Sequence, residues 1–161
     1  SWKEEMELLL AALDAETATE ALDLARQFWT HREARRQEYA FSLDMADYER
    51  QREWLEGLAK YSELALGHRA GTSRAYLPVT AIQDDPDFSA YNRQEEFWQQ
   101  QLKESVRSAR RSGENRFYYS GLVQAALLDR ISPGWQAGVI KETGISNSVG
   151  HASWSRAINF S

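Results

Sequence analysis

Glu53-Trp54-Leu55-Glu56-Gly57-Leu58-Ala59-Lys60-Tyr61 is the segment from which the arrangement of this chain is best inferred. Most of its residues favour a helix, yet it places Gly57 in the helix interior. A glycine there destabilises a helix by about 1 kcal/mol relative to alanine, so we expect another part of the structure to approach closely at this point. The acidic side chain of Glu56 lies directly beside it in the sequence.

The composition predicts one globular domain. Of the 161 residues, 42% are hydrophobic and 27% are charged, which is enough for a single core. The net charge of −5 argues against general nucleic-acid binding. The longest apolar run, residues 8–13, is too short to cross a bilayer, so we expect no membrane segment. Because cysteine is absent, the chain has neither disulfides nor a thiolate zinc site.

Apolar residues recur at helical spacing along most of the chain, which predicts an all-α fold. The predicted helices span about residues 2–13, 17–39, 44 to Gly67 or Gly71, 91–111 and 115–131, with a short helix from Ser132 through Ile140. The second begins with a capping-box pattern at Thr17-Ala18-Thr19-Glu20, and Asp44 is the expected N-cap of the third.

Pro78 and Pro86 predict one long loop at about residues 72–89. The expected architecture is therefore an irregular bundle of five to six helices in a single helical domain, residues 1–161. Because the chain opens on Ser1 without an initiating methionine, we expect this domain to be a fragment of a longer protein.

Charged faces on two helices leave their roles open. In the third predicted helix, the spacing of apolar residues predicts a buried side that consists of Tyr48, Leu55, Leu58, Ala59 and Leu66. The charged side chains fall together on another side, and they are Glu53, Glu56, Lys60 and Glu63. In the second helix, the segment His31-Arg32-Glu33-Ala34-Arg35-Arg36 is interpreted as a solvated face with weak ion pairs. The alternative for this segment is a subsite for an anion or a substrate carboxylate.

A second helix is also interrupted by glycine, at Tyr118-Tyr119-Ser120-Gly121 followed by Leu122-Val123. Together the two segments resemble motifs of gluzincin zinc metallopeptidases, the aminopeptidase-N-like group among them. In that family the first pattern is close to Trp-Leu-x-Glu-Gly-x-Ala-x-Tyr, and the second is Tyr-x-Lys-Gly before an apolar helix. Ser120 stands here where the family usually has lysine. The resemblance covers at most residues 45–140.

The resemblance implies that Glu56 is a zinc ligand and that the Tyr118 hydroxyl stabilises the oxyanion formed during peptide hydrolysis. A catalytic zinc has three protein ligands and lowers the pKa of a bound water to about 7. A phenol directed at the developing oxyanion would stabilise charge that appears only in the transition state.

Gluzincins take their other two ligands and their general base from His-Glu-x-x-His, which this sequence lacks. The nearest segment, residues 31–35, has arginine where the base and the second histidine should be. The motif either lies upstream in a longer precursor or has been lost. We therefore expect this chain alone to bind no zinc and to be inactive, with the upstream part of its precursor and a peptide substrate as partners. His68 and His151 are isolated.

Simpler interpretations stand beside this one. Glu56 is well spaced to pair with Lys60 one turn later, and Tyr118 and Tyr119 suit ordinary packing positions. The alternative function is a non-catalytic helical protein-interaction module, in which exposed aromatic residues and arginine-rich helix ends form a partner groove. Only the peptidase hypothesis requires Glu56 and Tyr118 to line one concavity.

Overall fold

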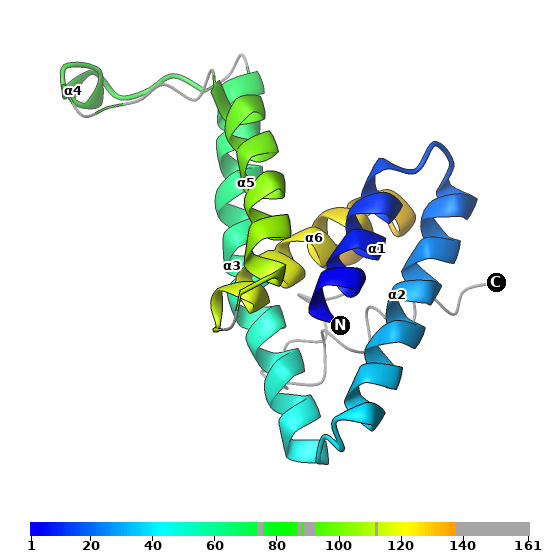
Figure 1. Cartoon of the computed structure of the whole chain (residues 1–161). Helices are drawn as coiled ribbons and strands as arrows, with labels where there is room; N and C mark the ends of the chain where they lie inside the picture. The colour runs from blue at the N-terminus through cyan, green and yellow to red at the C-terminus, as the bar shows by residue number, and fades with distance from the viewer. Residues whose placement is uncertain (74–75, 87, 89–92, 112, 138–161) are drawn as a thin grey trace.

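The computed structural model describes residues 1–73, 76–86, 88, 93–111 and 113–137 (Figure 1). The helices of this part are α1 (Trp2–Asp14), α2 (Ala18–Glu38), α3 (Leu43–Thr72), α4 (Thr80–Gln83), α5 (Gln94–Ala109) and α6 (Asn115–Ile131). No strand occurs among the described residues, and the predicted all-α class is confirmed. None of the described helices is both long and apolar enough to cross a membrane.

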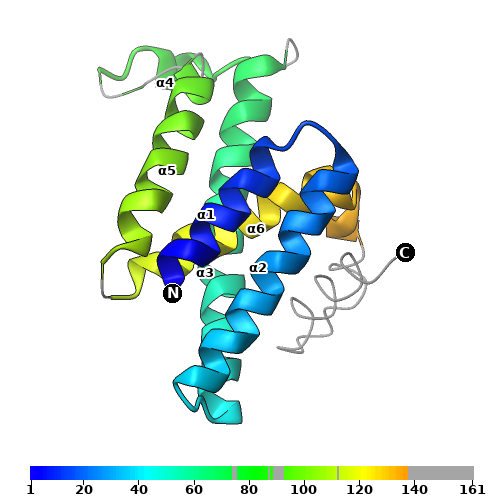
Figure 2. The same ribbon diagram turned by 45° about the vertical axis from the view of Figure 1, so that its right-hand side comes forward.

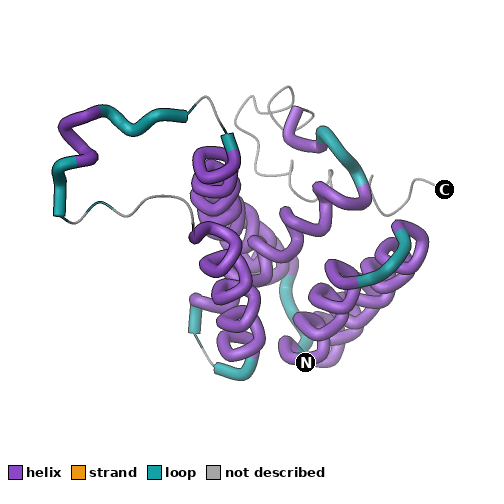
Figure 3. The backbone as a smooth tube through the Cα atoms, turned by 90° about the horizontal axis from the view of Figure 1, so that it is seen from above, coloured by secondary structure: helices purple, strands orange, loops and turns teal. Residues whose placement is uncertain are grey.

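Helix α6 lies at the centre of the bundle and contacts α1, α2, α3 and α5. Helices α1 and α2 form an antiparallel pair on one side, and α3 and α5 run antiparallel on the other (Figures 1 and 2). The short helix α4 lies on an excursion that extends away from the bundle, as the view from above shows (Figure 3). The largest apolar side chains that are fully buried are Phe28, Met6, Leu9, Leu122, Leu127 and Leu128.

The close approach predicted at Gly57 is made by α6. A β-carbon added to Gly57 would lie 2.3 Å from the Cα atom of Gly121. A β-carbon on Gly121 would in turn lie 2.0 Å from the carbonyl oxygen of Glu53. Because neither backbone can move without separating the two helices, both glycines are required for the crossing of α3 and α6. The two glycine-interrupted helices of the sequence are thus each other's neighbours.

Most predicted helix bounds agree with the structure, and the differences have local causes. The N-cap of α3 is Ser42 rather than Asp44, because the Ser42 hydroxyl accepts a hydrogen bond from the backbone N–H of Met45 at 3.2 Å. The loop predicted at residues 72–89 contains the single turn of α4. Residues 135–137 form a further helical turn, whereas the predicted continuation to Ile140 lies outside the described residues.

The predicted buried side of α3 is wrong except at Leu58, which packs against the core. Leu55 and Leu66 are 62% and 68% exposed, and Tyr48 is 49% exposed. The core-facing side instead carries Glu49 and Glu53, which are only 3% and 4% exposed. Hydrophobic spacing misleads here because arginine side chains from α2 neutralise these two carboxylates.

Candidate functional site

Three arginines and three glutamates form a buried network between α1, α2 and α3, which we call the arginine–glutamate network. Its members are Glu5 of α1, Arg32, Arg35 and Arg36 of α2, and Glu49 and Glu53 of α3. None of these residues is more than 5% exposed. The solvated face predicted for residues 31–36 is therefore wrong for the three arginines.

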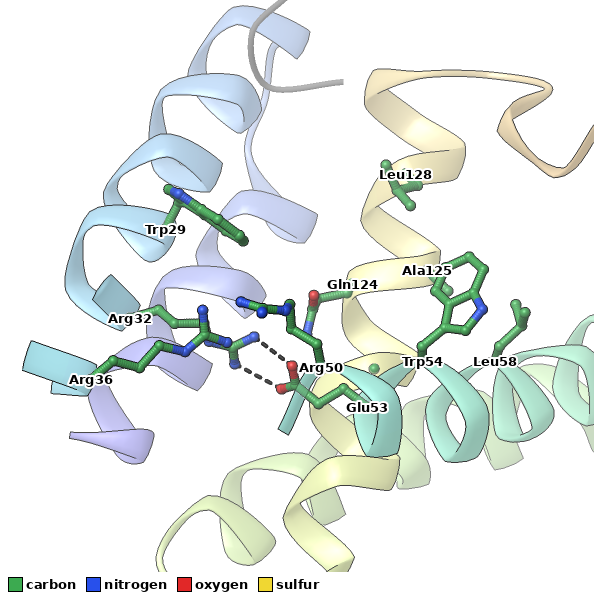
Figure 4. A pocket seen from close by; sticks show the side chains of 11 residues that line it. Trp29, Arg32, Arg36, Arg50, Glu53, Trp54, Leu58, Gln124, Ala125 and Leu128 are labelled. Atoms are coloured by element: carbon green, nitrogen blue, oxygen red, sulfur yellow. Dashed lines mark hydrogen bonds and ion pairs between the residues drawn. The ribbon is translucent and has the colours of Figure 1, made fainter. Parts of the chain in front are cut away.

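Arg32 is the central member of the network. Its Nη1 and Nη2 atoms donate to the two carboxylate oxygens of Glu53 at 2.6 and 2.7 Å (Figure 4). Its Nε atom donates to Glu5 at 3.0 Å. The guanidinium carbon of Arg32 also lies 4.4 Å from the centroid of the Phe28 ring. The paired hydrogen bonds from Arg32 to Glu53 have the planar, forked geometry that is the strongest form of arginine–carboxylate pairing.

The other two arginines share Glu49. Arg35 Nη2 donates to Glu49 Oε2 at 2.9 Å, and Arg36 Nη2 donates to Glu49 Oε1 at 2.8 Å. Arg35 Nε donates to Glu5 as well, and Arg36 Nη1 donates to Glu33 at 2.6 Å. The arginines thus bind carboxylates of their own chain, which is a structural use of charge rather than a free anion subsite.

Ser120 connects α6 to this network. Its hydroxyl donates to Glu53 and accepts from Arg32 Nη2 at 3.2 Å and from Gln124 Nε2 at 3.0 Å. Ser120 is only 1% exposed. It stands where the Tyr-x-Lys-Gly motif has lysine, and in this structure that position lies beside Arg32. A second buried cation at this position would face Arg32 at close range.

Burial and charge act in opposite directions on the two glutamates of α3. Burial alone would raise the pKa of Glu49, but the charges of Arg32, Arg35 and Arg36 outweigh it and hold this pKa below its ordinary value. Burial raises the pKa of Glu53, against the opposing charge of Arg32. Burial alone would lower the pKa of Arg32, but the three carboxylates around it outweigh burial and hold this pKa above its ordinary value.

Glu56 and Tyr118 form a second polar site, on the flank of the crossing of α3 and α6. The Glu56 side chain is 13% exposed, and its Oε1 atom lies 2.7 Å from Arg52 Nη1. Its Oε2 atom is buried and has no hydrogen-bond partner among the described residues. Hydrogen bonding to Glu56 and then the charge of Glu56 raise the pKa of Tyr118. Glu56 of α3 therefore lies near enough to Tyr118 of α6 to act on its ionisation.

Neighbouring side chains extend this site towards the start of α6. Arg52 Nη2 also donates to Glu114 at 2.8 Å, and the Tyr48 hydroxyl donates to the other oxygen of Glu114 at 2.9 Å. Lys60 pairs with Glu63 at 3.1 Å rather than with Glu56, so the simple Glu56–Lys60 pair is not formed. Tyr118 itself is 40% exposed and reachable by a ligand.

The described residues fit one zinc ligand but not a complete zinc site. The unpartnered Oε2 atom of Glu56 suits a carboxylate ligand. No group of three histidine, cysteine, aspartate or glutamate side chains that could hold a metal occurs in the described part of the chain. His31 is exposed on α2, and His151 lies outside the described residues.

The arginine–glutamate network is the feature that sequence reasoning missed. Its signal was present as Glu49 and Glu53 one turn apart on α3, and as Arg32 and Arg36 one turn apart on α2. Comparison of the chain with known protein families, curated proteins and solved structures finds no significant match.

Proposed function

We propose that this chain is the helical part of a gluzincin-like zinc peptidase, with Glu56 as a zinc ligand and Tyr118 as the oxyanion stabiliser. The observation that supports this most is that Glu56 of α3 lies near enough to Tyr118 of α6 for its carboxylate to raise the pKa of the phenol. These residues come from two helices far apart in the sequence, and the glycine pair Gly57 and Gly121 beside them holds those helices together.

The chemistry of Tyr118 suits the proposed role. The phenol of Tyr118 is protonated at neutral pH, because its pKa lies above the ordinary value of 10, so the hydroxyl carries a proton that it can donate. Its 40% exposure leaves room for a substrate carbonyl. A donor aimed at a developing oxyanion typically contributes a factor of about 100 to 1000 to kcat.

Glu56 would hold the metal through its unpartnered Oε2 atom, while Arg52 fixes the carboxylate through Oε1. When bound, zinc would supply a water of lowered pKa as the nucleophile. The two histidine ligands would come from the upstream part of the precursor, in keeping with the proposal that the chain is incomplete by itself.

Zinc titration and peptide hydrolysis of the full reading frame that encodes this chain test the proposal. Glu56→Gln should weaken zinc affinity at least tenfold, whereas Glu63→Gln, an exposed change on the same helix, should leave it within twofold. Tyr118→Phe should lower kcat about 100-fold or more with zinc affinity retained. Unchanged zinc affinity in Glu56→Gln would refute the assignment.

A non-catalytic interaction module is the second candidate, favoured by exposed apolar side chains. Leu77 and Val79, on the excursion that carries α4, are 82% and 61% exposed, and Leu66 of α3 is 68% exposed. If this is the function, Leu77→Ser with Val79→Ser should abolish partner binding, and Tyr118→Phe should have no effect on any activity of the full protein.

A further inference from the structure

A groove of about 660 Å³ opens where the start of α1, the turn between α2 and α3, and the turn between α5 and α6 meet. We call it the basic groove. Its cationic wall includes Arg110, Arg111 and Arg116, and its aromatic wall is Trp2, Tyr39 and Phe41. The start of α1 lies beside the turn that joins α5 to α6 (Figure 2). Neither Glu56 nor Tyr118 lines this groove.

The three arginines of the cationic wall have no acidic partner among the described residues. Arg110, Arg111 and Arg116 form no ion pair with any residue that the structure describes. The Nε atom of Arg116 is buried and donates no hydrogen bond to any part of the chain that the structure describes. Three cations that line one groove without an ion pair to the described residues are unexpected in a chain whose net charge is −5. They leave a concentrated positive potential in the groove.

Helix electrostatics explains only part of this charge. Arg110 and Arg111 follow the last turn of α5, where cations favour the helix dipole. Arg116, however, lies in the first turn of α6, where the dipole disfavours a cation. The first turn of α6 also has no side-chain cap. An anion bound in the groove would satisfy both Arg116 and this helix end.

The aromatic wall indicates what accompanies the anion. The Trp2 ring is already covered by the guanidinium groups of Arg116 and Arg35, at 4.8 and 4.7 Å from its centroid. Tyr39, by contrast, is 65% exposed, so its ring is free to stack on a planar group. The groove volume lies within the range of small-molecule sites.

We propose that the basic groove binds a small organic phosphate that carries a planar ring, the chemistry of a nucleoside monophosphate. The planar fork of arginine matches phosphate oxygens in pairs, which makes arginine the preferred side chain for phosphate recognition. The phosphate would lie against Arg110, Arg111 and Arg116, and the ring would stack on Tyr39. This inference is independent of the proposed peptidase function, because the two sites share no residue.

Calorimetric titration of the full chain with AMP at 50 mM and 200 mM salt tests the proposal. AMP should bind, and its affinity should fall as salt rises. The double variant Arg110→Ala with Arg111→Ala should weaken AMP binding at least tenfold, because it removes two of the three proposed phosphate contacts. Both side chains are exposed, so their removal leaves the core intact. Arg107→Ala is the matched control on the same helix, since Arg107 is 66% exposed and already pairs with Glu104. This control should stay within twofold.

Further ligands decide the chemical class. Tyr39→Ala should weaken the affinity for AMP at least fivefold, because it removes the ring on which the base would stack. The affinity for inorganic phosphate, which is weaker, should stay unchanged. Equal binding of AMP and adenosine would overturn the proposal, and so would equal losses in the arginine variants and the Arg107→Ala control. If an acidic peptide or a ten-nucleotide single strand binds more than tenfold tighter than AMP, the proposed small ligand is wrong and the groove binds a macromolecule.

Discussion

Gly57 of α3 faces Gly121 of α6 so closely that a β-carbon on Gly57 would lie 2.3 Å from the Gly121 Cα atom. This contact positions the rest of the molecule, because it sets Glu53 beside Ser120 and Glu56 beside Tyr118. It also explains why two helices with strong helix-forming sequences each contain an interior glycine.

Gly57→Ala should destabilise the protein by about 3 kcal/mol, because backbone atoms of α6 must move away. Gly67→Ala is the matched control on the same helix, where the new methyl group would meet only the flexible end of the Gln94 side chain. The control should change stability by less than about 1 kcal/mol. Urea unfolding measures both, and equal effects would show that the crossing does not depend on Gly57.

Arg32→Ala should destabilise the protein by about 3–5 kcal/mol, because it leaves Glu5 and Glu53 as buried carboxylates without their shared partner. Arg93→Ala removes an arginine that is 77% exposed and pairs with Glu96, so its effect should be below about 1 kcal/mol. Denaturant unfolding of both variants, with m-values compared, is the measurement. A loss below 1 kcal/mol for Arg32→Ala would contradict the network described here.

The pKa of Glu49 predicts how stability changes in acid. Because the folded state holds this pKa below its ordinary value of 4.5, the stability contributed by Glu49 is present above pH 4.5 and is lost as pH falls through the folded pKa. The pKa of Glu53 is raised by burial, so its contribution to stability changes with pH in the opposite sense and increases as pH falls. Glu49→Gln should therefore reduce the slope of unfolding free energy against pH below pH 4.5. A steeper slope in this variant would contradict the prediction.

Titration of Tyr118 tests its contact with Glu56 directly. Its phenol should ionise above the ordinary pKa of 10, because the Glu56 carboxylate stabilises the protonated form. Glu56→Gln should bring the pKa of Tyr118 back towards 10, and Glu63→Gln should leave it where it is. Carbon-13 NMR of ring-labelled tyrosine, assigned with Tyr118→Phe, gives the value. An unchanged pKa in Glu56→Gln would mean that the two side chains are apart in solution.

Ala40→Gly should stabilise the protein by about 0.5–1 kcal/mol. Ala40 has φ of 49°, a left-handed conformation that alanine adopts at a cost. It follows α2 in a Schellman motif, in which the N–H of Phe41 donates to the Arg36 carbonyl at 2.9 Å. Ala34→Gly, at an exposed position within α2, should have the opposite sign and cost about 1 kcal/mol. Thermal unfolding of the two variants checks both signs.

Local patterns were sufficient for part of this structure. The all-α class and the bounds of α6 follow from residue spacing, because helical periodicity depends on neighbours within a turn or two. The interior glycines likewise predicted close approach, since only contact with another backbone offsets their cost in a helix. The resemblance to gluzincins led us to expect Glu56 and Tyr118 to line one concavity. The structure places Glu56 near enough to Tyr118 for its carboxylate to raise the pKa of the phenol, and the shared catalytic role stays a prediction.

The buried side of α3 required the tertiary structure. Taken alone, Glu49 and Glu53 belong on a solvated surface, and Leu55 and Leu66 belong in a core. The actual arrangement is reversed because Arg32, Arg35 and Arg36 arrive from another helix and neutralise the carboxylates. The arginines of α2 leave no trace in the residue periodicity of α3, because they lie in a distant segment of the sequence. Only the folded arrangement of α1, α2, α3 and α6 therefore reveals which charges are buried.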